Sequence, residues 1–237
     1  MDAITYGDLA RVKTLVAKGA NVNYKAGNGR LPLSWAAANG HFEIVKYLIE
    51  KGANINGKDE WGFAPLGYIA GRGNLEEVKY MIDKGADVNA QGEKYDIPLH
   101  KAVLNGYLPV VKYLIDKGAN INAKNIYGIT ALHWASEQGS LDIVMLLLQK
   151  GAAIDVRTID GMTPLHEAAY TGHYKVVRYL IERGADANAK TTSEYRSSPA
   201  GSTPLDMARD PELEVKGNRG EQDIIKVIKI LEKYKAQ

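Results

Sequence analysis

The phrase Thr163-Pro164-Leu165-His166 decides how this chain folds, because close variants of it return along the sequence at a fixed interval. Successive copies begin 33 residues apart until the last, which follows after 40. The other five copies are Leu31-Pro32-Leu33-Ser34, Ala64-Pro65-Leu66-Gly67, Ile97-Pro98-Leu99-His100, Thr130-Ala131-Leu132-His133 and Thr203-Pro204-Leu205-Asp206. A fixed period of about 20–50 residues is typical of stacked repeat proteins, which generally work through their surfaces.

A second phrase, Gly-Ala followed in most copies by Asn or Asp, keeps the same period of 33 residues. Apolar residues at i, i+3 and i+4 precede it, as in Val144, Leu147 and Leu148, and they predict an amphipathic helix. Glycine directly after such a helix is typical of a left-handed residue that ends it. The Thr-Pro-Leu phrase is typical of a helix start, where threonine caps and proline is tolerated. Each period is therefore predicted to hold a short first helix and a longer second one.

The 33-residue period, the Thr-Pro-Leu-His helix start and the closing Gly-Ala-Asp/Asn-x-Asn together resemble the ankyrin repeat. The resemblance implies an all-α solenoid of about seven repeats including caps, built from helix–turn–helix units joined by β-turn fingers. Its general role is protein–protein recognition. We expect one domain over 1–237, with an N-terminal cap repeat 1–24, full repeats 25–57, 58–90, 91–123, 124–156 and 157–190, and a C-terminal repeat 191–237 with insertions.

The two ends depart from the period. Aligning Gly19 with Gly52 places Ala3 at the position of Ala36, so the first repeat is expected to begin partway through its first helix. The last repeat carries insertions within 191–202 and 210–220 before a final amphipathic helix. These insertions fit either a diverging cap, since terminal repeats are atypical, or an additional partner contact.

Composition narrows the function classes. The absence of cysteine excludes disulfides, thiolate catalysis and cysteine-ligated metals. The net charge of +2, with no long basic block, disfavours nucleic-acid binding. The longest aliphatic stretch, 143–148, is too short to cross a membrane, which takes about 20 residues. We expect a monomeric cytoplasmic protein, with nuclear localisation or delivery into a host cell left open.

No catalytic, metal or cofactor site is predicted. His100, His133 and His166 occupy equivalent places one repeat apart. Neighbouring helices pack about 8–10 Å apart, whereas zinc–nitrogen bonds are about 2 Å, so we interpret these histidines as structural. The predicted function is a non-enzymatic scaffold. The alternatives are a host-targeted effector, an enzyme-inhibiting regulatory subunit or, from another class, an enzyme with a site in the C-terminal insertion.

Large or charged side chains at positions that vary between repeats are the candidate contacts with a partner protein. The resemblance implies that these places form the concave face and the turn tips, and aromatic residues and arginine are enriched at interface hot spots. The predicted partner-binding residues are Arg30, Trp35, Trp61, Phe63, Tyr68, Arg72, Asp96, Lys101, Ile126, Tyr127, Trp134, Glu137, Ile159, Met162, Glu167 and Tyr170.

Overall fold

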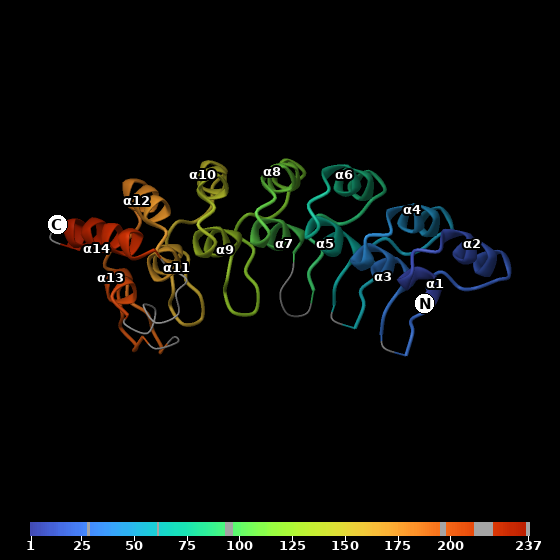
Figure 1. The fold of residues 1–237 in the computed structure, drawn as a ribbon, viewed down its shortest axis with the longest axis horizontal. Helices are drawn as coiled ribbons and strands as arrows, with labels where there is room; N and C mark the ends of the chain where they lie inside the picture. Colours follow the sequence, from blue (N-terminus) through green and yellow to red (C-terminus); the bar gives the residue numbers. More distant parts are fainter. Residues whose placement is uncertain (28, 61, 93–96, 195–197, 211–219, 236–237) are drawn as a thin grey trace. The chain divides into compact units, whose positions relative to one another are not determined.

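The computed structural model describes residues 1–27, 29–60, 62–92, 97–194, 198–210 and 220–235. The chain divides into two compact units, Met1–Asn120 (unit 1) and Ile121–Gln237 (unit 2). Each unit consists of helix pairs followed by long loops, which we call fingers (Figure 1). No β-strand occurs within the described ranges, so the predicted all-α class is confirmed.

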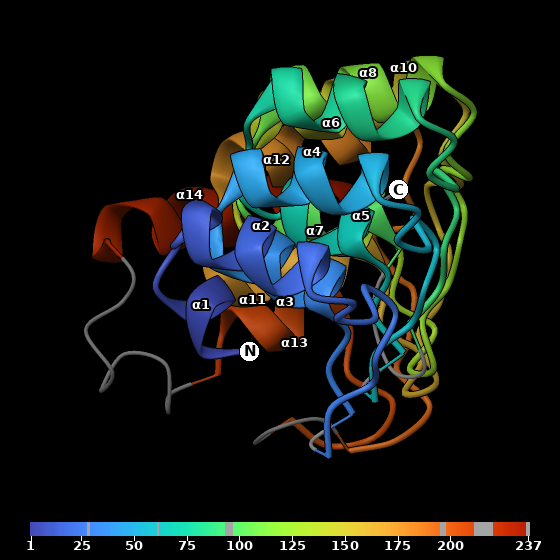
Figure 2. The same ribbon diagram turned by 90° about the vertical axis from the view of Figure 1, so that its right-hand side faces the viewer.

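The described residues of unit 1 form four helix pairs. The first helices of the pairs, which we call inner helices, are α1 (Asp2–Thr5), α3 (Pro32–Asn39), α5 (Pro65–Ala70) and α7 (Pro98–Leu104). The second, or outer, helices are α2 (Leu9–Ala17), α4 (Phe42–Glu50), α6 (Leu75–Asp83) and α8 (Leu108–Asp116). Consecutive inner helices contact one another, and the fingers extend from the inner-helix side, as Figure 2 shows for α3, α5 and α7.

Unit 2 repeats this arrangement and ends in a longer helix. Its inner helices are α9 (Ala131–Glu137), α11 (Pro164–Thr171) and α13 (Pro204–Ala208), and its outer helices are α10 (Leu141–Gln149) and α12 (Tyr174–Glu182). The final helix, α14 (Glu221–Lys235), packs on α12 and α13 and takes the place of the last outer helix. The predicted C-terminal amphipathic helix is therefore confirmed. Of the predicted insertions, residues 195–197 and 211–219 lie outside the described residues.

The repeated phrase specifies both the helix start and the core. Proline at the first helical position of α3, α5, α7, α11 and α13 lacks the N–H that would otherwise go unpaired there. The leucine of the phrase is nearly fully buried in all six copies, from Leu33 to Leu205. Alanines on the same helices, such as Ala36 and Ala135, are also buried and let neighbouring helices approach closely.

Asparagines of the closing phrase join consecutive repeats. In unit 1, the Asn23 side chain donates to the carbonyl of Gly52 at 3.0 Å and accepts from the N–H of Asn54 at 2.7 Å. Asn56 and Asn89 make the same pair of bonds one and two repeats later. In unit 2, Asn122 bridges to Gly151 and Ala153. Each asparagine satisfies a carbonyl near the end of an outer helix, where backbone groups would otherwise lack partners.

Candidate functional site

The first cluster of predicted contact residues in unit 1 is built around Trp35 on α3. The guanidinium carbon of Arg30 lies 3.7 Å from the centroid of the Trp35 ring, a stacked cation–π contact. The Trp35 indole N–H donates to the Thr5 hydroxyl at 2.9 Å. The side chains of Arg30 and Trp35 are both half-buried. The Trp35 ring thus mainly restrains the orientation of the Arg30 guanidinium stacked on it.

A second cluster lies one repeat further along, at α5 and the finger before it. The Phe63 ring meets the Tyr68 ring edge-on at 5.5 Å, and the Lys101 ammonium lies 5.3 Å from the Phe63 centroid. Asp59 is buried, and its carboxylate accepts from the Tyr68 hydroxyl at 2.6 Å and from the Phe63 N–H at 2.9 Å. Asp59 is not among the residues predicted from the sequence. The role of Asp59 could not be predicted because it depends on the tertiary contact between the finger and Tyr68.

Arg72 follows α5 and lies against Gly40, the residue that ends α3. A Cβ added to Gly40 would overlap the Arg72 guanidinium, so a larger residue here would require that side chain to shift. Gly40 also adopts the left-handed conformation, with φ of 76°. A cation at this place complements the negative end of the α3 dipole. Burial raises the pKa of Glu77, and the neighbouring Arg72 charge partly opposes that rise.

In unit 2, the fingers before α9 and α11 expose three large apolar side chains. Ile126, Tyr127 and Ile159 are 55%, 38% and 62% exposed. The two fingers touch, because the Ile159 N–H donates to the Tyr127 carbonyl at 2.9 Å. We call these three residues the fingertip patch of unit 2.

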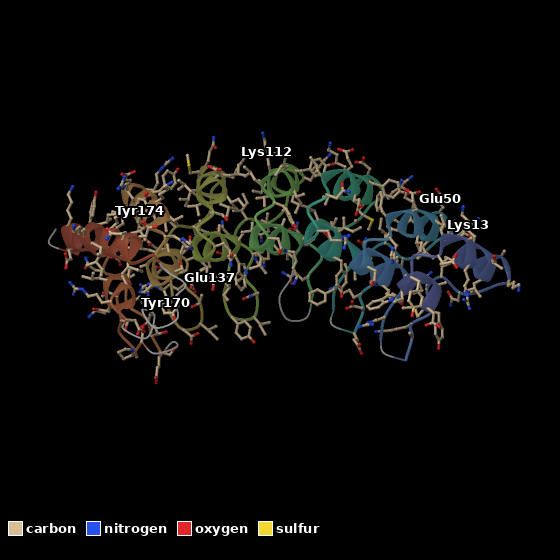
Figure 3. All side chains as sticks on the ribbon, in the orientation of Figure 1. Lys13, Glu50, Lys112, Glu137, Tyr170 and Tyr174 are labelled. Atoms are coloured by element: carbon tan, nitrogen blue, oxygen red, sulfur yellow. The ribbon has the colours of Figure 1, made fainter. Side chains whose placement is uncertain are left out.

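The inner helices of unit 2 hold four more of the predicted residues, Trp134, Glu137, Glu167 and Tyr170. Trp134 and Glu137 on α9 are half-buried, and the Glu137 carbonyl accepts a hydrogen bond from His173 at 2.9 Å. Figure 3 shows the Glu137 and Tyr170 side chains on the inner-helix side of unit 2, whereas Tyr174 lies on α12. Glu167 is only 5% exposed.

Met162 and Tyr170 belong to the interior of unit 2. Together with Met207 they form a buried apolar cluster. Their side chains therefore support the inner-helix surface from beneath and offer little area to a partner. Two further predicted residues, Trp61 and Asp96, lie outside the described residues.

The buried histidines of unit 2 cap helices. Nδ1 of His166 accepts from the Thr163 N–H at 3.2 Å, and Nε2 lies 3.2 Å from the Ser202 carbonyl. His133 makes the same pair of contacts with Thr130 and the Met162 carbonyl. Since a nitrogen that accepts from a backbone N–H is unprotonated, the neutral ring carries its proton on Nε2. Burial lowers the pKa of His166 from 6.5 to about 4, which keeps the ring neutral.

His41 and His173 connect neighbouring repeats at the turns between helices. His41 Nε2 lies 3.1 Å from the Thr5 carbonyl, and His173 pairs with Glu137 as described above. Within the described residues, no three His, Asp or Glu side chains are placed to share a metal ion. The part of the chain that the structure describes also contains no helix long and apolar enough to cross a membrane.

The C-terminal insertion borders a hollow of about 390 Å³, whose mixed polar and apolar lining includes Asp206, Arg209 and Asp210. The two carboxylates already hold the local fold. Asp206 accepts from the Thr203 N–H at 2.9 Å, and Asp210 accepts from the Ser198 hydroxyl at 3.1 Å. Thr203, Asp206 and Ser198 thus fix the start of α13 and the loop before it.

The most regular feature that sequence reasoning missed is the asparagine bridge between repeats. Its signal is present in the sequence, since the second Asn of the Gly-Ala-Asn-x-Asn phrase recurs every 33 residues at Asn23, Asn56, Asn89 and Asn122. An amide at a fixed position in every repeat stabilises the stacking of the repeats. Contacts with a partner are expected at the positions that vary between repeats.

Comparison with known proteins agrees with the geometry. A family profile of three ankyrin repeats matches residues 1–92, 33–125 and 99–191. The crystal structure of the human ASB11 ankyrin repeat domain is similar, with 29% sequence identity and a TM-score of 0.77 over 95% of this chain and 96% of that chain. A search of curated proteins finds no match. Ankyrin repeats are generally protein–protein interaction modules, and typically non-enzymatic. The chain belongs to the ankyrin repeat family.

Proposed function

We propose that this protein is a non-enzymatic scaffold that binds another protein through its inner-helix surfaces and finger tips. The observation that carries the proposal is the fingertip patch of unit 2. Ile126, Tyr127 and Ile159 expose large apolar side chains on two fingers that hydrogen-bond to each other. Contiguous exposed apolar groups at the surface of a soluble domain mark interaction sites.

The fingers suit this role because hydrogen bonds within a finger and between neighbouring fingers hold their backbones. The Asn125 carboxamide accepts from the N–H groups of Tyr127 and Ile129 at 2.9 and 3.0 Å. Arg157 donates to the Lys190 carbonyl of the next finger at 2.7 Å. A partner therefore meets side chains on preorganised backbone, which lowers the ordering cost of binding. We expect the protein to act as a monomer in the cytoplasm.

A photo-crosslinking amino acid at position 127 tests the proposal and identifies the partner in cells. Binding to the purified partner is then measured for Tyr127→Ala/Ile159→Ala. We expect its Kd to rise roughly tenfold or more, since hot-spot side chains contribute about 2 kcal/mol or more each.

Met145 supplies the matched control, because it is an exposed apolar residue of the same unit on the outer helix α10. Met145→Ala is expected to leave the Kd unchanged. If Met145→Ala weakens binding and the fingertip variant does not, the partner binds the outer helices and the proposed surface is wrong.

A further inference from the structure

We propose that an apolar hollow in the first repeat of unit 1 binds a Leu-Pro-Leu segment of a partner protein. This inference goes beyond the proposed function, because the hollow belongs to unit 1 and the fingertip patch to unit 2, and neither surface needs the other. It follows from a comparison of the first repeat with the second, which carries a Leu-Pro-Leu segment of its own.

The hollow has a volume of about 340 Å³ and lies at the N-terminal end of unit 1, where Figure 1 shows α1 and α2. Ala3 and Ile4 of α1, Val12 and Val16 of α2, and Tyr24 of the loop after α2 are among the residues that line it. Mostly apolar hollows of about 300–1,000 Å³ are typical of binding pockets. The hollow is therefore large enough for apolar side chains of a ligand.

The first repeat has a shorter inner helix than the second. α1 has four residues and α3 has eight, and alignment of the two repeats by their closing glycines places Met1 at the position of Ser34. The segment Leu31-Pro32-Leu33, which precedes Ser34, has no counterpart within residues 1–24. The first repeat thus lacks the leucine that is nearly fully buried in all six copies of the phrase.

The first leucine of this segment corresponds to one side of the hollow. In the second repeat Leu31 lies against Gly57, since a Cβ added to Gly57 would be 2.8 Å from Leu31 Cδ1. The residue of the first repeat that is equivalent to Gly57 is Tyr24, which lines the hollow and is 63% exposed. A leucine placed as Leu31 is would therefore lie beside Tyr24.

The second leucine of the segment corresponds to the interior of the hollow. Leu33 is buried on α3, which packs on α4, and α4 contributes the buried residues Val45 and Leu48. Their counterparts on α2 are Val12 and Leu15, and both line the hollow. Leu15 is 43% exposed, whereas Leu48 is 1% exposed. The first repeat thus leaves uncovered the kind of apolar surface that the second repeat covers.

The conformation of the second repeat favours an extended segment with a central proline. Leu31 has φ and ψ of −94° and 144°, an extended conformation that a following proline favours. A free Leu-Pro-Leu segment already prefers this conformation, which lowers the ordering cost of binding. Because the leucine is buried in all six copies of the phrase, a second copy of this chain has none to offer, and the segment comes from a different protein.

NMR titration of the ¹⁵N-labelled full chain tests the inference. The probes are the peptide Gly-Ser-Leu-Pro-Leu-Ser-Gly, the same peptide with alanine for its second leucine, and N-acetyl-leucinamide. We expect the leucine peptide to cause saturable shifts of the amide signals of Leu15, Val16 and Val22, which line the hollow. The alanine peptide is expected to bind roughly tenfold more weakly or worse, because the buried leucine side chain supplies most of the driving force. N-acetyl-leucinamide is likewise expected to bind more weakly than the leucine peptide.

Ala20→Phe is the blocking variant, because Ala20 is exposed and lines the hollow, so a larger side chain can occupy the site from its rim. We expect it to weaken binding of the leucine peptide roughly tenfold or more. Ala17→Phe is the matched control, since Ala17 is exposed on the same helix end and is not among the lining residues. Should Ala20→Phe lose its helical circular dichroism, Leu15→Ala replaces it, with weaker binding expected.

Four results would each overturn the inference: no binding of the leucine peptide, equal affinity for the two peptides, equal losses in Ala20→Phe and Ala17→Phe, or N-acetyl-leucinamide binding as tightly as the peptide, which would indicate a site for small apolar molecules. Sedimentation that shows a dimer of the wild type, abolished in Ala20→Phe, would also overturn it, because a second copy would then cover the hollow. None of these outcomes affects the proposed function, which the fingertip variant of unit 2 tests separately.

Discussion

Units 1 and 2 are built from the same type of repeat, but their inner helices begin differently. In unit 2 each inner helix starts at a threonine, Thr130, Thr163 or Thr203, whose N–H is bound by the side chain three residues later. In unit 1 the equivalent residues Leu31, Ala64 and Ile97 make no side-chain cap. Within the described residues, each unit also has a buried hydroxyl without a partner, Ser34 in unit 1 and Ser136 in unit 2. Buried polar groups that are paired stabilise a fold, and those left unpaired cost free energy.

The same contrast extends to charge and to surface. Unit 2 contains the exposed apolar fingertip patch and the buried capping histidines His133 and His166, whereas unit 1 contains one buried histidine, His100, and two cations that lie against aromatic rings, Arg30 and Lys101. We expect unit 2 to be the more stable of the two units, because its inner helices have capped starts. The predictions below test the stability half of this comparison.

The largest expected effect is a pH dependence specific to unit 2. His166 has a pKa of about 4 in the folded chain, against an ordinary value of 6.5, because burial disfavours the charged ring. The unfolded chain therefore takes up a proton as pH falls from 6.5 to 4, and the stability that neutral His166 provides above pH 6.5 is lost over that range. At about 1.4 kcal/mol per pKa unit the loss is at most about 3 kcal/mol.

Urea unfolding followed by Trp134 fluorescence measures this dependence in a Trp35→Phe/Trp61→Phe background, whose two substitutions lie in unit 1. His166→Gln is the control, since it cannot titrate in this range. The free-energy difference between the parent and His166→Gln is expected to shrink as pH falls from 7 to 4. A difference that stays constant with pH would show that His166 is already charged or that its burial is relieved before unfolding.

The second expected effect is a loss of stability in His133→Ala. The substitution removes the partner of the Thr130 N–H and of the Met162 carbonyl, both in buried surroundings. Unsatisfied buried groups cost about 1–3 kcal/mol, so the melting temperature should fall. Calorimetric titration with zinc should show no stoichiometric site in the wild type. A tight zinc signal that disappears in His133→Ala would contradict the structural role of this histidine.

Most of the fold could be predicted from the sequence because one phrase, repeated at a fixed interval, specifies the helix start, the buried leucine and the helix end together. The solvent exposure of individual variable positions could not be predicted in the same way. Met162 occupies a turn position equivalent to Ile129, which suggests a surface location, yet it is buried in a cluster with Tyr170 and Met207. Asp59 shows that a carboxylate on a polar loop can also become buried, here because Tyr68 reaches it.

The smallest effect concerns the uncapped helix starts of unit 1. Each missing threonine cap costs typically about 1 kcal/mol, and in a stack of repeats such deficits are felt locally. We therefore expect residues 1–90 to open before residues 124–190. Native-state hydrogen exchange, read by mass spectrometry, should show faster exchange in α4 and α6 than in α10 and α12. Slower exchange in α4 and α6 would refute the link between capping and local stability.

Ala64→Thr sharpens this last test, because the backbone at Ala64 already has the geometry of a capping residue. Its φ and ψ of −82° and 153° are close to the −91° and 167° of Thr203, which caps α13. Ala64 is 4% exposed, and the capping residues Thr130 and Thr163 are buried to a similar degree in unit 2, so a threonine here meets comparable surroundings. Ala64→Thr should raise the free energy of opening of α5 and α6 by up to about 1 kcal/mol and so slow their exchange. Thr163→Ala should lower the free energy of opening of α11 by a similar amount and so speed its exchange. If Thr163→Ala speeds exchange and Ala64→Thr has no effect, then packing limits the opening of α5, and the difference between the units at this helix does not come from the cap.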